Sequence, residues 1–210
     1  MIRVLGNLPT DCYIACSGGV DSMAALSFLA NNPQRKVEVL FFDHGTDTSK
    51  AAKYFLIDFC IQNAITFHSG KISALKPRRK SLEEHWRDER YKFFKEFSDK
   101  PIIFGHHLDD VVENYVFTMI NGNEFLIPYK RDNYLRPFLA TPKNKLIEWC
   151  KNKNVPWLED CSNEDNTFSR NRIRNILLPE IKKINPGIQK VVAKKIINAY
   201  NELSRFPVIL

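Results

Sequence analysis

Short apolar, β-rich runs alternate with runs of helical periodicity along the first 120 residues of the chain. The apolar runs predict strands at residues 12–15, 37–42, 65–68 and 101–105. The periodic runs predict helices at residues 21–31, 49–63, 81–97 and 108–120. This βαβα alternation predicts an α/β fold, with a doubly wound parallel sheet and helices on both faces.

The pattern changes after Gly122. Residues 134–138 predict a short strand or turn, and the pair after them predicts a helix with Thr141 as N-cap and Pro142 as its first residue. Two basic helices are predicted at residues 171–184 and 187–204. We therefore predict an α/β core over residues 1–140 and a basic helical extension over residues 141–210, packed on that core.

A glycine-rich run lies between the first predicted strand and helix: Ser17-Gly18-Gly19-Val20-Asp21-Ser22. This arrangement suits pyrophosphate, because glycines let backbone N–H groups approach an anion and the helix N-terminus adds positive charge. The lysine of a Walker loop is missing, so amides and hydroxyls would bind the phosphates, and Asp21 offers hard oxygens to Mg²⁺. The alternative is a simple tight turn in which Ser17 or Ser22 caps the helix.

Polar residues follow three of the predicted strands, at Ser17, at Asp43-His44-Gly45 and at His106-His107. Ligands of parallel sheets lie at the carboxyl ends of the strands, so one rim should collect these side chains. Asp43 is placed to accept hydrogen bonds from a ribose or a base edge.

A string dense in titratable groups begins at His106: His106-His107-Leu108-Asp109-Asp110-Val111-Val112-Glu113-Asn114. Asp110 and Glu113 are three positions apart and share a helix face. Two alternatives are acids that only complement the helix dipole and a transition-metal site. Both histidines and both aspartates remain open as the general base.

The chain carries a net charge of +7, and its basic residues gather near the end. From Arg170 onward, nine Lys or Arg residues face two acids. Such a surface attracts polyanions such as nucleic acid, although a solvated charged face is the alternative.

The five cysteines are odd in number and form no CxxC pair, which favours reduced thiols in the cytoplasm over a zinc ribbon. No apolar run approaches the ~20 residues of a membrane span, and the N-terminus has no long apolar segment typical of secretion signals. We therefore expect a cytoplasmic protein without a membrane partner.

Taken together, the motifs resemble the N-type ATP pyrophosphatases, or PP-loop enzymes, and among them the tRNA(Ile)-lysidine synthetases. The resemblance covers about residues 11 to 180. It rests on these segments, in the family's order: SGGVDS at Ser17, Asp43-His44-Gly45, Leu82-Glu83 with Arg87 and Arg90-Tyr91, His106 to Glu113, Leu135-Arg136-Pro137, Pro156-Trp157 with Glu159-Asp160 and Ser162-Asn163, and Arg170 to Arg174 with Leu178-Pro179.

The resemblance implies an ATP-dependent ligase. In the family, the carbonyl oxygen of the wobble cytidine attacks the α-phosphate of ATP, pyrophosphate leaves, and the amine of free lysine displaces AMP. The implied ligands are ATP with Mg²⁺, free lysine and tRNA(Ile) with a CAU anticodon, and homodimerisation stays open.

The resemblance also implies roles for individual residues. Asp21, His106, Asp110 and Glu113 would be catalytic, with Asp110 and Glu113 binding the lysine. The nucleotide would contact Ser17, Gly18, Gly19, Asp21, Ser22, Asp43, Gly105 and Arg174. The lysine or tRNA would contact Arg87, Arg170 and Arg172 in addition to the two acids.

The chain departs from the family at Thr46-Asp47, Val111 and Asn114, and has a short segment from Asn121 to Tyr134. Family members continue into further tRNA-binding domains, so the resemblance implies a truncated or minimal form. Two other functions stay open: a PP-loop enzyme with another acceptor or nucleophile, as in thiolation, and a nucleotide- or tRNA-binding module without turnover.

Overall fold

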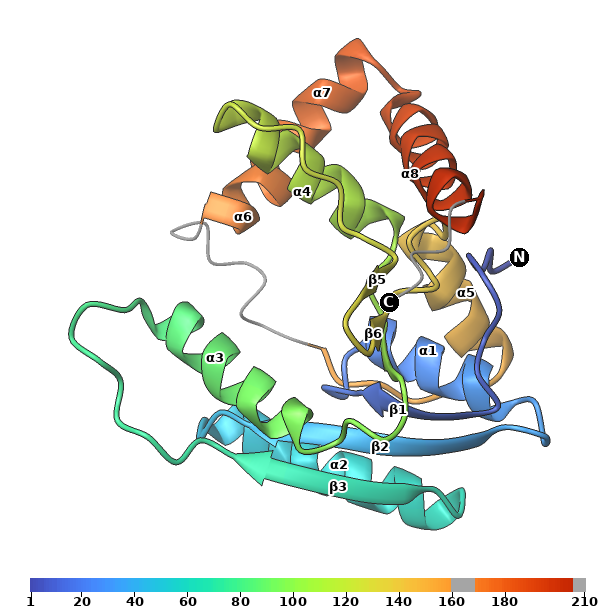
Figure 1. The fold of residues 1–210 in the computed structure, drawn as a ribbon, viewed down its shortest axis with the longest axis vertical. Coiled ribbons are helices and arrows are strands. Elements are labelled where there is room, and N and C mark those ends of the chain that lie inside the picture. Colours follow the sequence, from blue (N-terminus) through green and yellow to red (C-terminus); the bar gives the residue numbers. More distant parts are fainter. Residues whose placement is uncertain (160–168, 206–210) are drawn as a thin grey trace.

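The computed structural model describes residues 1–159 and 169–205, and its centre is a six-stranded sheet in the order β3-β2-β1-β4-β6-β5 (Figure 1). Neighbouring strands are parallel except for the antiparallel pair of β5 and β6. The strands are β1 (Asp11–Ala15), β2 (Lys36–Asp43), β3 (Thr66–Lys71), β4 (Ile102–Phe104), β5 (Lys130–Arg131) and β6 (Tyr134–Leu135).

Helices follow the strands as the alternation predicts. They are α1 (Val20–Ala30), α2 (Asp47–Gln62), α3 (Leu82–Lys95), α4 (Leu108–Ile120), α5 (Lys143–Asn152), α6 (Ser169–Arg172), the π-helical turn η2 (Ile173–Leu177), α7 (Leu178–Ile184) and α8 (Ile188–Arg205). The first four predicted strands and helices lie within three residues of these bounds. The predicted basic helix at 171–184 is instead three consecutive segments, because η2 interrupts it.

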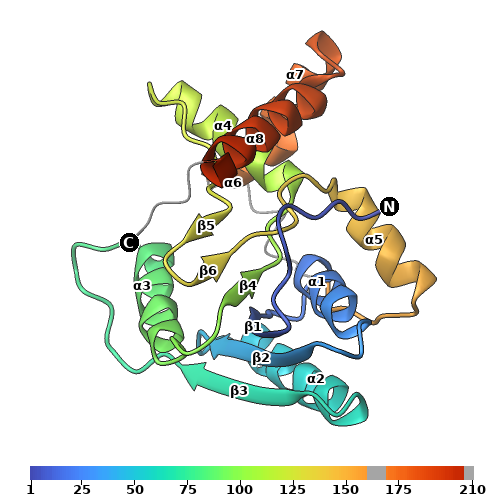
Figure 2. The ribbon, with the colours of Figure 1, turned by 45° about the vertical axis from the view of Figure 1, so that its right-hand side comes forward.

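Helices cover both faces of the sheet, which confirms the predicted fold class. Side chains alternate between the faces of a strand, and Ile14 accordingly packs with α1, α2 and α5, while its neighbour Tyr13 packs with α3. Figure 2 shows α3 on one side of the strands and α1 and α2 on the other. A third apolar cluster joins α4 to η2, α7 and α8.

The segment after residue 140 divides between these clusters. Helix α5 buries Leu146 and Cys150 against α1 in the main core, whereas α8 buries Val192 and Ile196 against α4. The division into units 1–140 and 141–210 stays a prediction. Among the described residues, no helix combines the length and apolar character that a membrane crossing requires.

The start of α5 differs from the prediction. Pro142 is the N-cap, and Thr141 is fully buried with its hydroxyl bonded to the backbone of Arg3, in the segment before β1. This hydroxyl donates to Arg3 O at 2.6 Å and accepts from Arg3 N at 2.9 Å. The predicted Thr141 cap was therefore wrong, because a tertiary contact uses the oxygen that a cap would need.

Glu38 on β2 forms a buried ionic network near the other end of the sheet. Its carboxylate accepts from Lys100 Nζ at 2.6 Å and lies 2.7 Å from His68 Nε2. Burial acts to raise the Glu38 pKa, but these partners outweigh it and lower the pKa from 4.5 to about 2. The folded chain therefore binds this proton more weakly than the unfolded chain does.

We expect Glu38→Gln to destabilise the protein by about 3 kcal/mol at neutral pH, from the shift of the Glu38 pKa. Because the folded-state pKa is the lower one, this contribution is complete above about pH 5 and disappears as the pH falls toward 2. Urea unfolding of both proteins between pH 3 and 7 measures it, with the exposed Glu148→Gln as control. A stability difference that is constant with pH would contradict the assignment.

Candidate functional site

The glycine run forms a tight loop between β1 and α1. Gly18 has φ +86°, in the left-handed region that favours glycine, and Gly19 is the N-cap of α1. No side chain among the described residues caps α1, so the alternative in which Ser17 or Ser22 is a capping serine is wrong. Ser22 shapes the loop instead, since its hydroxyl donates to Gly19 O at 3.0 Å and accepts from Ser17 N at 3.2 Å. No side chain of residues 1–159 or 169–205 caps the first-turn amides of α1, as an anion-binding loop requires.

Gly105 brings the end of β4 against this loop. A Cβ atom at Gly105 would lie 2.9 Å from Asp21 O and 3.2 Å from Ser22 Cα. Both contacts are with backbone, which cannot yield as a flexible side chain can. Glycine is therefore required for the His106-His107 segment to reach the first turn of α1.

His107 links the two motifs that the sequence places 90 residues apart. Its Nε2 lies 3.3 Å from Asp21 Oδ1, and the side chain is only 3% exposed. Its Nδ1 accepts from Asp110 N at 3.4 Å, and its own N–H donates to Asp110 Oδ2 at 2.9 Å. His107 is thus both the cap of α4 and the neighbour of Asp21, although its Nε2 forms no hydrogen bond within the described residues.

These contacts move the pKa values of both partners. Burial acts to lower the His107 pKa, but Asp21 and Asp110 outweigh it and raise the pKa. Burial acts to raise the Asp21 pKa, but His107 and Lys143 outweigh it and lower the pKa. Asp21 is therefore a carboxylate at neutral pH, which is the form that a divalent cation binds.

Lys143 is a site residue that sequence reasoning missed. Its Nζ lies 3.4 Å from Asp21 Oδ2, and it belongs to the first turn of α5. In the sequence, the one feature that could have indicated its role is its place in the first turn of a helix, where the helix dipole disfavours a cation. Its position depends on the packing of α5 against α1.

The neighbouring aspartates of the acidic motif have different partners. Asp109 accepts from Lys143 N at 2.8 Å and from Gln189 Nε2 at 2.7 Å, so it anchors the start of α5 and the side of α8. Asp110 turns back to the backbone of His107. Asp109 is thus engaged in holding helices together, although the sequence left it open as the general base.

Glu113 is paired with arginines from the C-terminal segment. It is 4% exposed, and its Oε2 accepts from Arg174 Nε at 2.9 Å, with Arg174 Nη2 at 2.7 Å. Arg170 Nη1 lies 3.4 Å from Glu113 Oε1. Arg172 is exposed on α6, on a different side of that short helix. The structure therefore brings Arg170 and Arg174 to the acidic motif and leaves Arg172 at the surface.

The remaining predicted residues lie along the same rim. Asp43 Oδ1 accepts from Gly45 N at 2.8 Å and from the Ser49 hydroxyl. Burial acts to raise the Asp43 pKa, but these two donors outweigh it and lower the pKa. The Arg87 guanidinium lies 5.8 Å from the centre of the Tyr91 ring on α3. The His106 ring is stacked on Phe104, and burial lowers its pKa to about 4.

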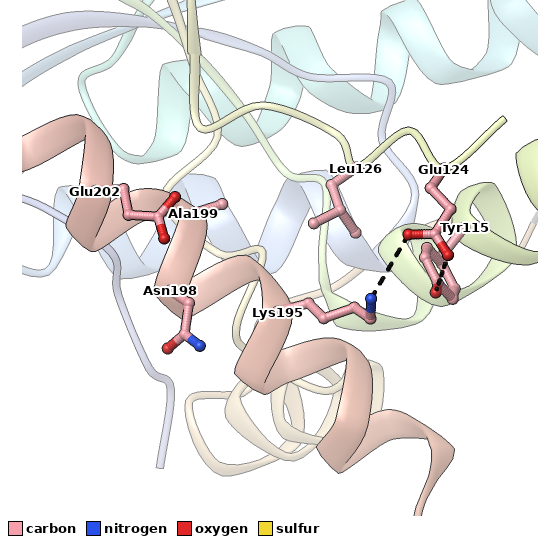
Figure 3. A pocket seen from close by; sticks show the side chains of 7 residues that line it. All are labelled: Tyr115, Glu124, Leu126, Lys195, Asn198, Ala199 and Glu202. Atoms are coloured by element: carbon pink, nitrogen blue, oxygen red, sulfur yellow. Dashed lines mark hydrogen bonds and ion pairs between the residues drawn. The ribbon is translucent and has the colours of Figure 1, made fainter.

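A surface pocket of about 240 Å³ lies elsewhere, between α4 and α8 (Figure 3). Lys195 Nζ lies 3.7 Å from Glu124 Oε2 there, and Tyr115 OH donates to Glu124 Oε1 at 3.4 Å. Its lining consists of Tyr115, Glu124, Leu126, Lys195, Asn198, Ala199 and Glu202. None of the predicted site residues is among them, so the loop and the acidic motif remain the candidate site.

Comparisons with known proteins agree with this geometry. Residues 7–181 match the family model described as a PP-loop domain. The tRNA(Ile)-lysidine synthase of Thermotoga sp. (strain RQ2) is 32% identical over 194 residues, which are 85% of this chain and 47% of that protein. The enzyme of the same name from Enterococcus faecalis is 31% identical over 196 residues, 86% of this chain and 42% of the relative. The chain thus spans about half the length of these curated relatives.

Two solved structures share the fold. The U34-tRNA thiolase NcsA from Methanococcus maripaludis with its [4Fe-4S] cluster has a TM-score of 0.73 at 14% identity, over 94% of this chain and 76% of that one. The NH3-dependent NAD synthetase from Campylobacter jejuni in complex with the nitrate ion has a TM-score of 0.54 at 13% identity, over 97% of this chain and 90% of that one. At these identities the likeness concerns the fold alone.

The glycine loop at the end of β1 faces the HHLDD segment, and the family match runs from residue 7 to residue 181. The chain therefore belongs to the PP-loop family, with tRNA(Ile)-lysidine synthases among its homologues.

Proposed function

We propose that the chain is the catalytic part of an ATP-dependent ligase that makes lysidine at the wobble cytidine of tRNA(Ile) with a CAU anticodon. The observation that carries the proposal is the 3.3 Å approach of His107 to Asp21, which sets the phosphate loop beside the acidic motif. The lysidine synthases among its homologues support the choice of substrates.

The reaction has two steps. The cytidine carbonyl oxygen attacks the α-phosphate of ATP, a P–O bond breaks, and pyrophosphate leaves. The lysine amine then attacks the activated carbon, AMP departs, and one proton is lost from the amine. The amides of the glycine loop bind the pyrophosphate part, where negative charge develops in the first step.

Asp21 fits a magnesium ion that arrives with ATP. Asp21 Oδ1 is buried and accepts no hydrogen bond from the described residues, and no group of three or more His, Cys, Asp or Glu among them forms a metal cage. Mg²⁺ commonly binds through one or two carboxylates together with substrate phosphates. When bound, it would neutralise charge on the leaving pyrophosphate.

Asp110 and Glu113 would bind the lysine. A carboxylate attracts the ammonium group and can accept the proton that the attacking amine loses. Glu113 is already paired with Arg170 and Arg174, so lysine would share this carboxylate with the arginines of α6 and η2. Those arginines would also reach phosphates of ATP or RNA, for which a planar guanidinium is suited.

Thiolation is the second candidate within the same nucleotide chemistry. The described cysteines Cys12, Cys16, Cys60 and Cys150 are free and buried. Burial raises the thiol pKa of Cys12 and Cys150 to about 11 and that of Cys60 to about 12. Such thiols are unreactive at neutral pH, which supports lysine as the nucleophile. Cys161 lies outside the described residues.

The direct test is incubation with ATP, Mg²⁺, lysine and a tRNA(Ile) transcript. We expect AMP, pyrophosphate and a cytidine heavier by lysine less water, detected by mass spectrometry of digested RNA. A transcript with uridine at the wobble position is the control. AMP release driven by sulfide would favour thiolation. ATP binding without AMP under any combination would refute the ligase and favour a binding module.

Asp21→Ala should lower the rate of AMP formation by about 100-fold or more, because the charge that develops on the leaving pyrophosphate loses its stabilisation. The melting temperature should stay within about 3 °C of wild type. The Asp21 side chain is 35% exposed, and ion pairs of such a side chain contribute little to stability. Activity and thermal melts of Asp21→Ala and Asp21→Asn measure both effects. A collapsed melting temperature would show that Asp21 is structural.

Lys143 should supply the phosphate-binding cation that the loop sequence lacks. Lys143→Ala is expected to raise the KM for ATP about 10-fold, equivalent to one charge-assisted hydrogen bond. Lys145→Ala is a matched control, because Lys145 lies on the same helix and pairs with Glu148 at 2.6 Å. Equal KM values for the two variants would exclude this role for Lys143.

A further inference from the structure

The second half of the rim holds buried basic groups that lack partners. Six buried polar side-chain atoms form no hydrogen bond within the described part of the chain. Four of them belong to basic residues. His107 Nε2 faces Asp21, and the other three lie away from the glycine loop: His44 Nδ1 after β2, Arg90 Nε on α3 and His106 Nδ1 after β4. An unpaired buried polar atom destabilises the folded chain, so the presence of these atoms needs an explanation.

Arg136, just after β6, adds a guanidinium to the half-buried Arg90, whose Nε atom is buried. Arg136 is 6% exposed, lies 5.4 Å from the centre of the Phe104 ring, and donates to Pro128 O at 3.2 Å. Among the described residues, the arginines with carboxylate ion pairs are Arg170 and Arg174. Arg90 and Arg136 therefore have no such partner there.

These four residues lie within electrostatic reach of one another. Burial is the main cause that lowers the pKa of His44 to about 4, and Arg90 lowers it further. His106 is lowered to about 4 in the same way, with Arg136 and Arg90 both contributing. Both imidazoles are thus neutral at pH 7 and can donate one N–H each beside two permanent cations. We refer to His44, Arg90, His106 and Arg136 as the basic cluster.

Flat rings hold the basic cluster in place. The His106 ring is stacked on Phe104, with centres 5.5 Å apart and planes 17° apart. The His44 ring lies 5.1 Å from Trp86. Because Arg136 contacts the same Phe104 ring, the polar atoms are fixed before any ligand binds, which lowers the entropy cost of binding.

The basic cluster is separate from the phosphate loop. Phe104 packs with α3 on one face of the sheet, whereas the glycine loop leads into α1, which packs on the other. The two neighbouring histidines divide accordingly, since His106 stacks on Phe104 and His107 approaches Asp21.

We propose that the basic cluster is a second anion site, which holds a carboxylate or phosphate group of the acceptor substrates while the triphosphate lies in the glycine loop. The inference rests on the proposed function for the identity of those substrates: lysine brings a carboxylate and RNA brings phosphates. Burial lowers the His106 pKa and the nearby charge of Asp110 opposes this effect, so Asp110 is close enough for a zwitterion to place its ammonium group and its carboxylate on adjacent partners.

The test compares Arg90→Met with Lys95→Met, a change of an exposed lysine that follows Arg90 by five residues on α3. Ligand binding is measured as the rise in melting temperature with lysine, with cadaverine, which lacks the carboxylate, and with an anticodon stem-loop RNA. If the anion is the carboxylate, wild type responds to lysine over cadaverine, and Arg90→Met weakens lysine binding about 10- to 100-fold. If it is a phosphate, Arg90→Met weakens RNA binding and lowers its salt slope by about one.

The melting temperature without ligand gives an independent readout. Removing a guanidinium whose buried Nε lacks a partner among the described residues should raise it by about 2 to 4 °C, whereas loss of a structural guanidinium would lower it. His44→Phe keeps the ring contacts, removes the nitrogen, and serves as the second variant should Arg90→Met unfold. Unchanged binding of both lysine and RNA in the folded variant overturns the proposal. Because no readout requires turnover, this result is distinguishable from failure of the ligase reaction.

Discussion

The contact on which the site depends is the approach of Gly105 to the first turn of α1. A side chain at this position would meet the Asp21 backbone at 2.9 Å, so the end of β4 can lie here only without one. His107 then lies 3.3 Å from Asp21, and α4 begins at Leu108 with Asp109 and Asp110 in its first turn. One missing Cβ thus sets the distance between the phosphate loop and the acidic motif, while the parallel sheet only brings them to the same rim.

The sequence allowed the sheet, the first four helices and the rim to be predicted, because they follow from local periodicity and from the geometry of parallel strands. The Lys143 to Asp21 contact could not be predicted in this way, since it depends on how α5 packs on α1. Asp109 and Asp110 are equivalent by type, but successive residues on a helix point about 100° apart. One therefore faces α5 and α8, and the other faces His107.

The partners of Glu113 show why charged residues of one motif have different environments. Arg170 and Arg174 reach it from a segment in which a π-helical turn follows α6, and such turns often occur at functional sites. A carboxylate that is 4% exposed needs such partners, because an unpaired buried charge is far more costly than a paired one. The Glu113 carboxylate is already removed from water in the free protein. A ligand ammonium group that joins Glu113 and its arginines would therefore not have to desolvate this acid on binding.

The charges along the rim also form an ordered series. The dipole end of α1 and Lys143 are positive on one face of the sheet, and Arg90 and Arg136 are positive near Phe104 on the other face. Asp110 is a carboxylate residue between them, bonded to the His107 backbone, whereas Glu113 is paired with Arg170 and Arg174. Burial alone would select against two arginines that have no carboxylate partner among the described residues, because apolar side chains would fill the same space at lower cost. Substrates that carry two anions with a cation between them would complement this arrangement. They would offset the cost of Arg90 and Arg136 only when they are bound, which is expected of groups retained for binding.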